Sequence, residues 1–303
     1  MNRPNVLVTE PIAESAMQRL SQRYNVISTL NDSNIQSINA ILTRKAPVTR
    51  EIISKAKNLH LIANHGSGTD QIDLQAAKEF NVEVLSAPGQ NALSVAEMTI
   101  GFFLALSYKV KYADEGLRIG QFQSFGIKDL QGNEISNKKI GLIGSGNIAL
   151  HVARIMTSAF NADIYCFNPH KSKEELLSLG LKKIDSINEL LALCDFVSIH
   201  IPLNEGTKNL ISAKNFSFAN SNLILVNTAR GGIVNETDLY AALVNRKIKG
   251  AACDVFTKEP PSKDLPLLHL SNFLATPHIA GSTKEALERV GNKTVDNIIS
   301  VLG

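Results

Sequence analysis

One short segment constrains the fold more than any other part of this 303-residue chain. Residues 138–157 read KKIGLIGSGNIALHVARIMT, an apolar run that turns through glycines into a sequence with helical periodicity. Gly144, Gly146 and Ala149 form G-x-G-x-x-A, the small-residue variant of the dinucleotide-binding fingerprint. The first glycine permits a tight turn, the second lets backbone amides approach a pyrophosphate, and the alanine keeps the helix close to the strand. Because similar turns occur without a nucleotide, the surrounding sequence decides what this segment means.

Strand and helix patterns alternate from the N-terminus, as they do in α/β proteins. The predicted strands are 5–9, 24–28, 40–43, 61–64 and 82–85, and the predicted helices are 11–23, 49–57 and 73–80. These elements make a compact α/β layer of about ninety residues. The turn at 64–73 has glycines after a strand, where backbone amides can hold a carboxylate. From that segment alone, a glycine turn capped by Asp70 or Asp73 is the simpler interpretation.

Residues 86–97 are predicted to bridge two domains. They contain a turn at Pro88 and a plausible helix cap, Ser94, with Glu97 three residues later. The helix is expected to run from residue 95 to about 118. Its centre, 98–106, is apolar nearly all round, so it should be buried on several sides, and a partner subunit could cover part of it.

Further strands and polar strand ends follow the glycine segment. The predicted strand regions are 162–167, 195–203, 223–232, 251–256 and 272–278, and helices are expected at 236–245 and 282–302. Ligands in open parallel sheets bind beyond the carboxyl ends of the strands, so the polar residues at these ends should converge. The last helix is amphipathic and could return to pack on the first domain.

The composition fits a folded two-domain protein, with 44% hydrophobic and 19% charged residues. A formal net charge of +3 is too small to indicate nucleic-acid binding by itself, although it suits anionic small molecules. Cys166, Cys194 and Cys253 have no C-x-x-C spacing, so we expect small buried side chains in a reduced protein and no metal site. No segment has the pattern of a signal peptide or membrane span, so a cytoplasmic location and no membrane partner are expected.

The turn after the second strand of the nucleotide unit bears on which dinucleotide is bound. An Asp or Glu about two dozen residues after the first glycine would bind the ribose hydroxyls, but that position is Asn168. His170, Lys171 and Lys173 crowd the same turn. A cationic turn without the carboxylate suits a 2′-phosphate, so NADP is predicted ahead of NAD. The alternative is an ordinary solvated basic loop.

Four further motifs resemble those of a known family. They are H-I-P-L at 200–203, N-T-A-R-G-G-I-V at 227–234, D-V-F-T-K-E-P at 254–260 and T-P-H-I-A-G at 276–281. Together with the glycine fingerprint, they stand in the order and spacing of the D-isomer-specific 2-hydroxyacid dehydrogenases. The resemblance covers essentially the whole chain.

The three catalytic residues that the resemblance implies have side chains that suit the reduction of a 2-oxo acid by hydride transfer. Arg230 presents a planar fork that can take a 2-oxo acid carboxylate and its adjacent carbonyl together. His278 can donate a proton to the carbonyl oxygen as hydride reaches carbon 2. Glu259 would hydrogen-bond the other ring nitrogen, orient the imidazole and favour its protonated form.

The resemblance also implies binding residues. It implies that Ser67 and Gly68 bind the substrate carboxylate through backbone amides, that Asp254 contacts the nicotinamide amide, and that His200 lies beside the cofactor and is not the acid. The expected cofactor-binding set is Gly144, Ser145, Gly146, Asn147, Ile148, Asn168, His170, Lys171, Lys173, His200, Pro202, Thr207, Thr228, Ala229, Asp254 and Gly281.

The same resemblance implies two Rossmann-like domains and a homodimer formed through the larger one. The doubly wound dinucleotide-binding domain would span 94–281, and a smaller flavodoxin-like substrate domain would combine 1–93 with 282–303. The leading hypothesis is an NADP-preferring reductase of short 2-oxo acids, similar to glyoxylate or hydroxypyruvate reductases.

Other functions stay open at this point. One is 3-phosphoglycerate dehydrogenase, because the segment 41–49 resembles the one in which that enzyme uses an arginine near the substrate phosphate; Arg44 is equally a solvated surface charge. A function of another class is a dinucleotide-sensing binding protein similar to corepressors with this fold. Oxidation of formate or phosphonate has less support, because no motif is specific to those substrates.

Overall fold

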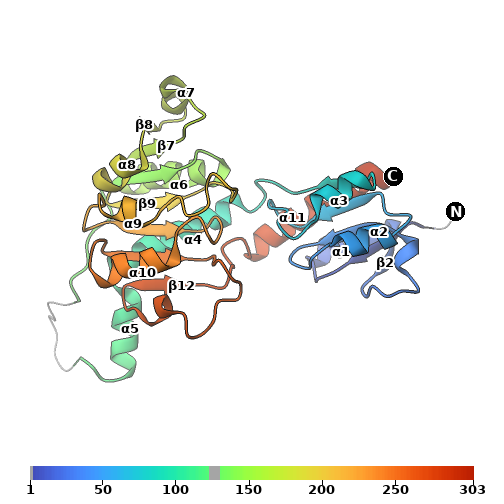
Figure 1. Cartoon of the computed structure of the whole chain (residues 1–303), viewed down its shortest axis with the longest axis horizontal. Helices are drawn as coiled ribbons and strands as arrows, with labels where there is room; N and C mark the ends of the chain where they lie inside the picture. The colour runs from blue at the N-terminus through green and yellow to red at the C-terminus, as the bar shows by residue number, and fades with distance from the viewer. Residues whose placement is uncertain (1–2, 123–129) are drawn as a thin grey trace. The chain divides into compact units, whose positions relative to one another are not determined.

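The computed structural model describes residues 3–122 and 130–303, and the chain divides into two compact units (Figure 1). Unit 1 comprises Met1–Asn91 with Gly281–Gly303, and unit 2 comprises Ala92–Ala280. Each unit is built on one parallel sheet with helices packed against it. The prediction of an α/β protein with two Rossmann-like units is therefore confirmed.

The sheet of unit 1 has five parallel strands in the order β2-β1-β3-β4-β5, which is the flavodoxin-like order. The strands are β1 Asn5–Val8, β2 Asn25–Ile27, β3 Ile38–Thr43, β4 Leu61–Asn64 and β5 Glu83–Leu85. The helices are α1 Glu14–Arg23, α2 Arg50–Lys55, α3 Leu74–Glu79 and the C-terminal α11 Lys284–Leu302, with a 3₁₀ turn η1 at Ile35–Ser37. The register sets Val8 opposite Leu42 and Thr43 opposite Asn64, so β1, β3 and β4 end close together.

Alternate residues of the β1 strand enter two different cores, as the pleat of a strand requires. Val6 and Val8 pack with α1 and α11, through residues such as Leu20 and Val295. Leu7 faces the other side, where α2 and α3 pack. The C-terminal helix therefore packs on the first unit, as its amphipathic pattern suggested.

The sheet of unit 2 has seven parallel strands in the order β12-β11-β10-β9-β6-β7-β8. The strands are β6 Lys139–Ile143, β7 Asp163–Phe167, β8 Lys182–Ile184, β9 Phe196–Ile199, β10 Ile224–Asn227, β11 Gly250–Cys253 and β12 Phe273–Ala275. The helices are α4 Ala92–Ser107, α5 Val110–Arg118, α6 Asn147–Phe160, α7 Lys173–Ser178, α8 Ile187–Leu193, α9 Ala213–Phe216 and α10 Glu236–Val244, with a 3₁₀ turn η3 at Pro266–His269. The order reverses between β6 and β9, where doubly wound folds bind dinucleotides.

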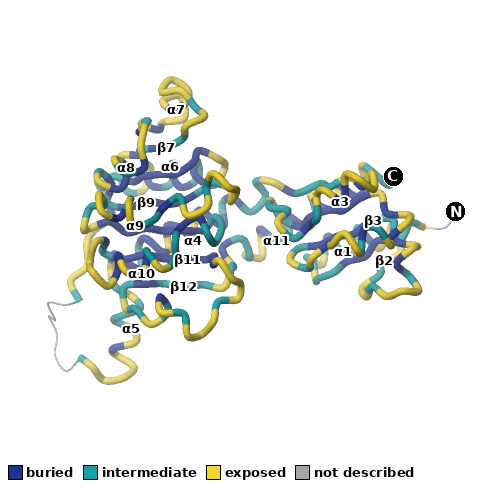
Figure 2. The backbone as a smooth tube through the Cα atoms, viewed as in Figure 1, coloured by how far each residue is buried: buried dark blue, intermediate teal, exposed yellow. Residues whose placement is uncertain are grey.

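The sheet of unit 2 is buried on both faces. One face packs with α4 and α6, and the other packs with α8, α9 and α10. The buried residues follow the central strands, whereas α7 is mostly exposed (Figure 2). Strands buried on both sides explain why the sequence of this region reads as short apolar runs.

The single long helix predicted from residue 95 to about 118 is wrong. The chain forms α4 and then α5, which meet at a bend of 60°. Lys109 has a left-handed φ of 53°, and the Ser107 carbonyl accepts a hydrogen bond from the Asn133 amide at 3.0 Å. The chain segment around Asn133 therefore takes over the hydrogen bonding at the end of α4, and the helix cannot continue.

Ser94 does not cap the helix, because α4 begins two residues earlier. It is buried, and its hydroxyl donates to the Ala280 carbonyl at 2.6 Å. The S-x-x-E pattern, which is a local signal, is overridden here by a tertiary contact.

No single helix of the described residues suggests a membrane span, and none of their cysteines suggests a disulfide. Within the described ranges no single helix is long and apolar enough to cross a membrane, and only the bent pair α4 and α5 meets that test together. Cys166, Cys194 and Cys253 are all buried and free. Burial raises the pKa of the Cys166 and Cys194 thiols to about 12, so these thiols are unreactive near neutrality.

Candidate active site

The polar residues singled out in unit 2 follow the carboxyl ends of its parallel strands. They come after β6, β7, β9, β10, β11 and β12, all along one edge of the sheet. This is the edge where open α/β sheets bind their ligands.

The glycine turn after β6 has the geometry that the fingerprint requires. Gly144 has a φ of 101°, and a Cβ atom there would lie 2.6 Å from the His200 carbonyl oxygen. A Cβ atom on Gly146 would meet no atom within 4 Å, so the space beside the N-terminus of α6 is open. Asn147 and Ile148 begin that helix, and Ala149 is fully buried against the sheet. Open space at a helix N-terminus with free backbone amides fits a pyrophosphate.

Asn168, the residue that follows β7, connects its turn to the glycine turn. Its side-chain Nδ2 donates to the Ser145 hydroxyl at 2.8 Å, and its Oδ1 accepts from the His170 amide at 2.9 Å. His170 and Lys173 are exposed, and Lys171 is half-buried. Both polar atoms of the amide therefore shape the turn, which the sequence alone did not indicate.

A second feature of this turn is the start of α7. Ser172 caps the helix, and the Glu175 carboxylate accepts from the Ser172 amide at 2.7 Å in a capping box. Lys173 and Glu174 follow the cap on an exposed surface. The basic turn is thus followed by two glutamates, Glu174 and Glu175, whose carboxylates both hydrogen-bond at the start of α7.

His200 and Pro202, which follow β9, are both expected to contact the cofactor, but the two residues differ in burial. The Nδ1 atom of His200 is buried, and its Nε2 atom lies 2.8 Å from the Ser198 hydroxyl. Burial lowers the pKa of His200 to about 3, so this imidazole is neutral and unsuited to be a general acid near pH 7. Pro202 is exposed, and its carbonyl accepts from the Thr207 hydroxyl at 2.7 Å.

The loop after β10 presents Arg230. The side chain of Asn227 is buried and shapes this loop, because its Nδ2 donates to the Arg230 carbonyl and its Oδ1 accepts from the Ala229 amide. The Arg230 guanidinium in turn donates to the Ala229 carbonyl at 2.7 Å. The Thr228 hydroxyl is buried 3.1 Å from that of Thr99 on α4.

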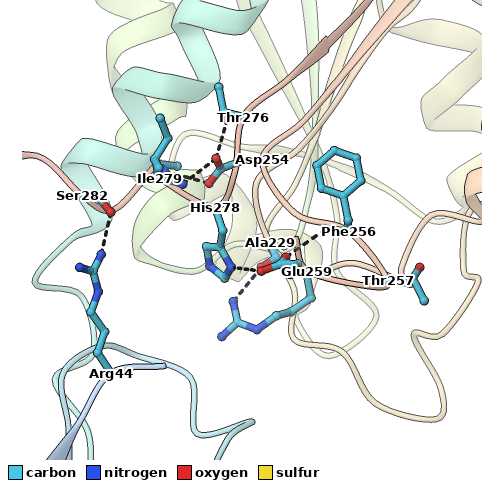
Figure 3. A network of polar contacts seen from close by, with 12 residues as sticks. Arg44, Ala229, Asp254, Phe256, Thr257, Glu259, Thr276, His278, Ile279 and Ser282 are labelled. Atoms are coloured by element: carbon cyan, nitrogen blue, oxygen red, sulfur yellow. Dashed lines mark hydrogen bonds and ion pairs between the residues drawn. The ribbon is translucent and has the colours of Figure 1, made fainter. Parts of the chain in front are cut away.

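His278 and Glu259 are brought together although 19 residues separate them (Figure 3). The His278 Nδ1 lies 2.7 Å from the Glu259 Oε2, and the other carboxylate oxygen accepts from the Phe256 amide at 3.0 Å. The two side chains are 40% and 33% exposed. A partly exposed imidazole with its second nitrogen held by a fixed carboxylate is the arrangement of a general acid–base pair.

The backbone at His278 is in the left-handed region, with a φ of 57°. Its amide donates to the Asp254 carbonyl at 2.7 Å. The buried Asp254 carboxylate accepts from the Thr276 hydroxyl and from the Ile279 and Ala280 amides, at 2.5 to 2.8 Å (Figure 3). Asp254, expected beside the nicotinamide amide, thus holds the loop that presents His278.

Unit 1 has its own group of polar residues at the ends of β1, β3 and β4. Ser67 is exposed and Gly68 is half-buried, and the Gly68 carbonyl accepts from the Asn64 side chain at 2.6 Å. The side chain of Asp73 caps α3 by accepting from the Ala76 amide. Gly281 also belongs to this unit, where a Cβ atom would lie 2.6 Å from the Asn91 side chain.

Glu10 organises the loop after β3. Its carboxylate accepts from three successive backbone amides, those of Arg44, Lys45 and Ala46, at 2.6 to 2.9 Å, and from the Thr9 hydroxyl. Although desolvation by partial burial acts in the opposite direction, these hydrogen bonds hold the pKa of Glu10 below its ordinary value. Sequence reasoning missed this role, since the three backbone amides lie 34 to 36 residues away.

Arg44 and His65 lie in the same part of unit 1. The Arg44 guanidinium donates to the Ser282 hydroxyl at 2.7 Å (Figure 3). His65 is 4% exposed, and neither ring nitrogen has a hydrogen-bond partner among the described residues. Burial and the positive charge of Arg44 lower the pKa of His65 to about 4. Nothing in the local sequence distinguishes this histidine from a solvent-exposed one.

Within the described residues, no group of three or more His, Cys, Asp or Glu side chains could hold a metal ion. Unit 2 instead combines an open glycine turn, a loop that carries a guanidinium group and a His–Glu pair, all of which follow strands along one edge of its sheet. Such a set can bind a pyrophosphate, hold a carboxylate and transfer a proton.

Comparisons with known proteins agree with this chemistry. Residues 100–280 match the family described as D-isomer specific 2-hydroxyacid dehydrogenase, NAD binding domain. The chain is 37% identical over 308 residues to D-3-phosphoglycerate dehydrogenase of Methanocaldococcus jannaschii, covering 98% of this chain and 57% of that protein. It therefore spans little more than half the length of that relative.

In two further comparisons, the alignment covers almost the whole of this chain and of the other protein. The chain is 37% identical over 313 residues to hydroxypyruvate reductase of Thermotoga maritima, covering 100% of each. The crystal structure of the TT0316 protein from Thermus thermophilus has a TM-score of 0.90 at 28% identity, covering 98% of this chain and 96% of that one. The similarity thus extends over both units.

Proposed function

The chain belongs to the D-isomer specific 2-hydroxyacid dehydrogenase family, and we propose that it transfers a hydride between a nicotinamide cofactor and a small 2-oxo or D-2-hydroxy acid. The observation that carries this proposal is the His278–Glu259 pair, joined at 2.7 Å beside the strand ends of a dinucleotide-binding sheet.

The proposed roles follow from the chemistry of each side chain. A bound nicotinamide cofactor would supply the hydride for carbon 2 of the oxo acid, or would take it up from the hydroxy acid. His278 gives its proton to the carbonyl oxygen in reduction and recovers it in oxidation. Glu259 holds the imidazole through Nδ1, which leaves Nε2 for the substrate. Arg230 binds the carboxylate and polarises the adjacent carbonyl.

We propose a substrate domain made of 1–93 and 282–303 and a cofactor domain made of 94–281, bounds that differ from those of units 1 and 2 by two residues at the first boundary and by one at the second. Ser67 and Gly68 follow β4 at the carboxyl edge of its sheet, where backbone amides can bind a carboxylate.

A panel of 2-oxo acids tests the activity and its substrate. Glyoxylate and hydroxypyruvate are proposed as the best substrates, because the relative named hydroxypyruvate reductase aligns over its full length. Oxidation of NADPH and NADH should be followed with these two acids, pyruvate, phenylpyruvate and 3-phosphohydroxypyruvate. Turnover of one or more supports the proposal. Intact cofactor binding with no turnover on any acid would instead favour a dinucleotide-sensing binding protein.

NADP is proposed ahead of NAD. The support is that position 168 carries no carboxylate and that His170, Lys171 and Lys173 follow it on a largely exposed turn. The triple variant Asn168→Asp, His170→Gln, Lys171→Gln should shift the preference towards NADH. Unchanged selectivity would mean that these residues form only a solvated loop.

A second candidate substrate is 3-phosphoglycerate. The observation that favours it is the Arg44 guanidinium, which donates to a neutral hydroxyl, that of Ser282. That cation is suited to a substrate phosphate. Arg44→Ala should then raise KM for 3-phosphohydroxypyruvate at least about tenfold and leave KM for glyoxylate nearly unchanged. Equal effects on both would point to a general structural role.

A homodimer through unit 2 is also proposed. Met98 and Leu104 of α4 are only partly buried, and Tyr108 and Val110 beyond its end are each 53% exposed. An apolar face of this kind suits a second copy of the chain. Light scattering on the purified protein should give twice the monomer mass of 32.9 kDa.

A further inference from the structure

We infer that Glu236 is a positioning residue for the acid–base pair, acting through the turn that carries Glu259; this inference rests on the proposed function. Glu236 is the first residue of α10 and lies 23 positions before Glu259 in the chain. It is half-buried and is not part of any motif to which a role has been given.

The contact that carries the inference is made to the backbone. The Glu236 Oε1 accepts a hydrogen bond from the Thr257 amide at 2.6 Å, a short distance typical of a charge-assisted bond. The neighbouring Phe256 amide donates to the Glu259 Oε1 at 3.0 Å. Two carboxylates thus take two successive amides of the turn that carries Glu259.

Gly231 fixes the same turn from another side. A Cβ atom on Gly231 would lie 2.0 Å from the carbonyl carbon and oxygen of Phe256 and 2.5 Å from the Thr257 nitrogen. The loop that presents Arg230 therefore touches the peptide between residues 256 and 257. This peptide is held between the Gly231 backbone and the Glu236 carboxylate, so a small shift in it changes the distance between the arginine loop and Glu259.

The start of α10, which carries Glu236, is held in place by its cap and by the core. The side chain of Asn235 caps α10 by accepting from the Asp238 amide at 3.0 Å, and Leu239 of the same helix is buried in the core. A carboxylate in the first turn of a helix is also favoured by the helix dipole. The helix therefore provides a fixed point from which Glu236 sets the turn.

The consequence concerns geometry at His278. Glu259 reaches the His278 Nδ1 at 2.7 Å only while its turn keeps its place. Displacements of about 1 Å in a catalytic group can lower turnover by about a hundredfold. Losing the Glu236 contact should therefore reduce proton transfer more than it reduces binding.

Three variants test this inference. Glu236→Ala should lower kcat about tenfold or more, with KM and cofactor affinity within about twofold of wild type. Glu236→Gln should keep most of kcat, because its amide oxygen can still accept from Thr257. The matched control is Asp238→Ala, which removes a 2.9 Å bond from the same helical turn to the Ala213 amide. It should lower the melting temperature by a similar amount and leave kcat unchanged.

A measurement independent of turnover completes the test. In ¹⁵N-histidine NMR spectra, the Nδ1–H signal of His278, identified by its loss in His278→Ala, should move or broaden in Glu236→Ala and stay in place in Asp238→Ala. An unmoved signal, or a kcat loss equal in both alanine variants, would overturn the inference. If wild type reduces no 2-oxo acid while the signal still moves, the proposed function fails and the positioning role stands.

Discussion

Alanine at Gly146 and at Gly144 should separate cofactor binding from stability. Gly146 has a φ of −78°, which alanine adopts freely, and no atom lies within 4 Å of its added methyl group. The loss of a glycine N-cap costs a few tenths of a kcal/mol or more, and the stiffer unfolded chain returns about 0.4–1 kcal/mol. The free energy of unfolding should thus change by less than about 1 kcal/mol.

The expected loss at Gly144 is larger. Alanine there meets a positive φ of 101° and a carbonyl oxygen 2.6 Å away. The backbone strain costs about 1–2 kcal/mol and the overlap about 1–3 kcal/mol, so the unfolding free energy should fall by about 2–5 kcal/mol.

Alanine at Gly146 should weaken cofactor binding although it hardly changes stability. The Gly146→Ala methyl group would occupy the space assigned to the pyrophosphate and weaken NADPH binding at least tenfold, or about 1.4 kcal/mol. Urea unfolding of the free protein and calorimetric titration with NADPH measure the two quantities. The reasoning would be refuted by a Gly146→Ala protein that binds NADPH like wild type, or that loses as much stability as Gly144→Ala.

Two further predictions concern unit 1. The pKa of His65 is about 4 in the folded protein and ordinarily 6.5, so on acidification the unfolded chain binds the proton first. The free energy of unfolding should therefore fall by up to about 3 kcal/mol as the pH drops from 6.5 towards 4. Urea unfolding at pH 7 and about pH 4.5 should show this loss in wild type and a smaller one in His65→Leu. Glu10→Gln should lower the free energy of unfolding by about 1–2 kcal/mol at pH 7, because the glutamine side-chain nitrogen cannot accept hydrogen bonds from the backbone amides of 44–46. The difference from wild type should shrink below pH 4.5, as the pH approaches the lowered pKa of Glu10. A difference that is the same at all pH values would contradict this.

Much of the fold is readable from local sequence because its signals are local. The apolar run at 61–64 is the β4 strand itself, and the glycine turn before α6 has the predicted conformation. The His278–Glu259 contact was also predicted, since both residues belong to motifs with known spacing. The roles of the two domains and of all the site residues, His278 and Glu259 included, stay predictions.

The errors and omissions arise where distant residues decide the local structure. The helix break at Lys109 depends on the segment near Asn133, and Ser94 bonds a carbonyl 186 residues away. Glu10 and Glu236 accept hydrogen bonds from backbone amides 35 and 21 residues away, and a contact over such a distance leaves no local pattern in the sequence. Side chains that bond backbone groups are therefore the part of a site that sequence reasoning finds last.

The central claim is that His278 transfers the proton that accompanies hydride transfer. The most direct test compares wild type with His278→Ala in the rate of NADPH oxidation by the best 2-oxo acid, with the dissociation constant of NADPH measured in parallel. We expect turnover to fall by about a hundredfold or more, the usual range for loss of a general acid, with cofactor affinity within about twofold of wild type. A His278→Ala protein that reduces the substrate at a normal rate would contradict the account.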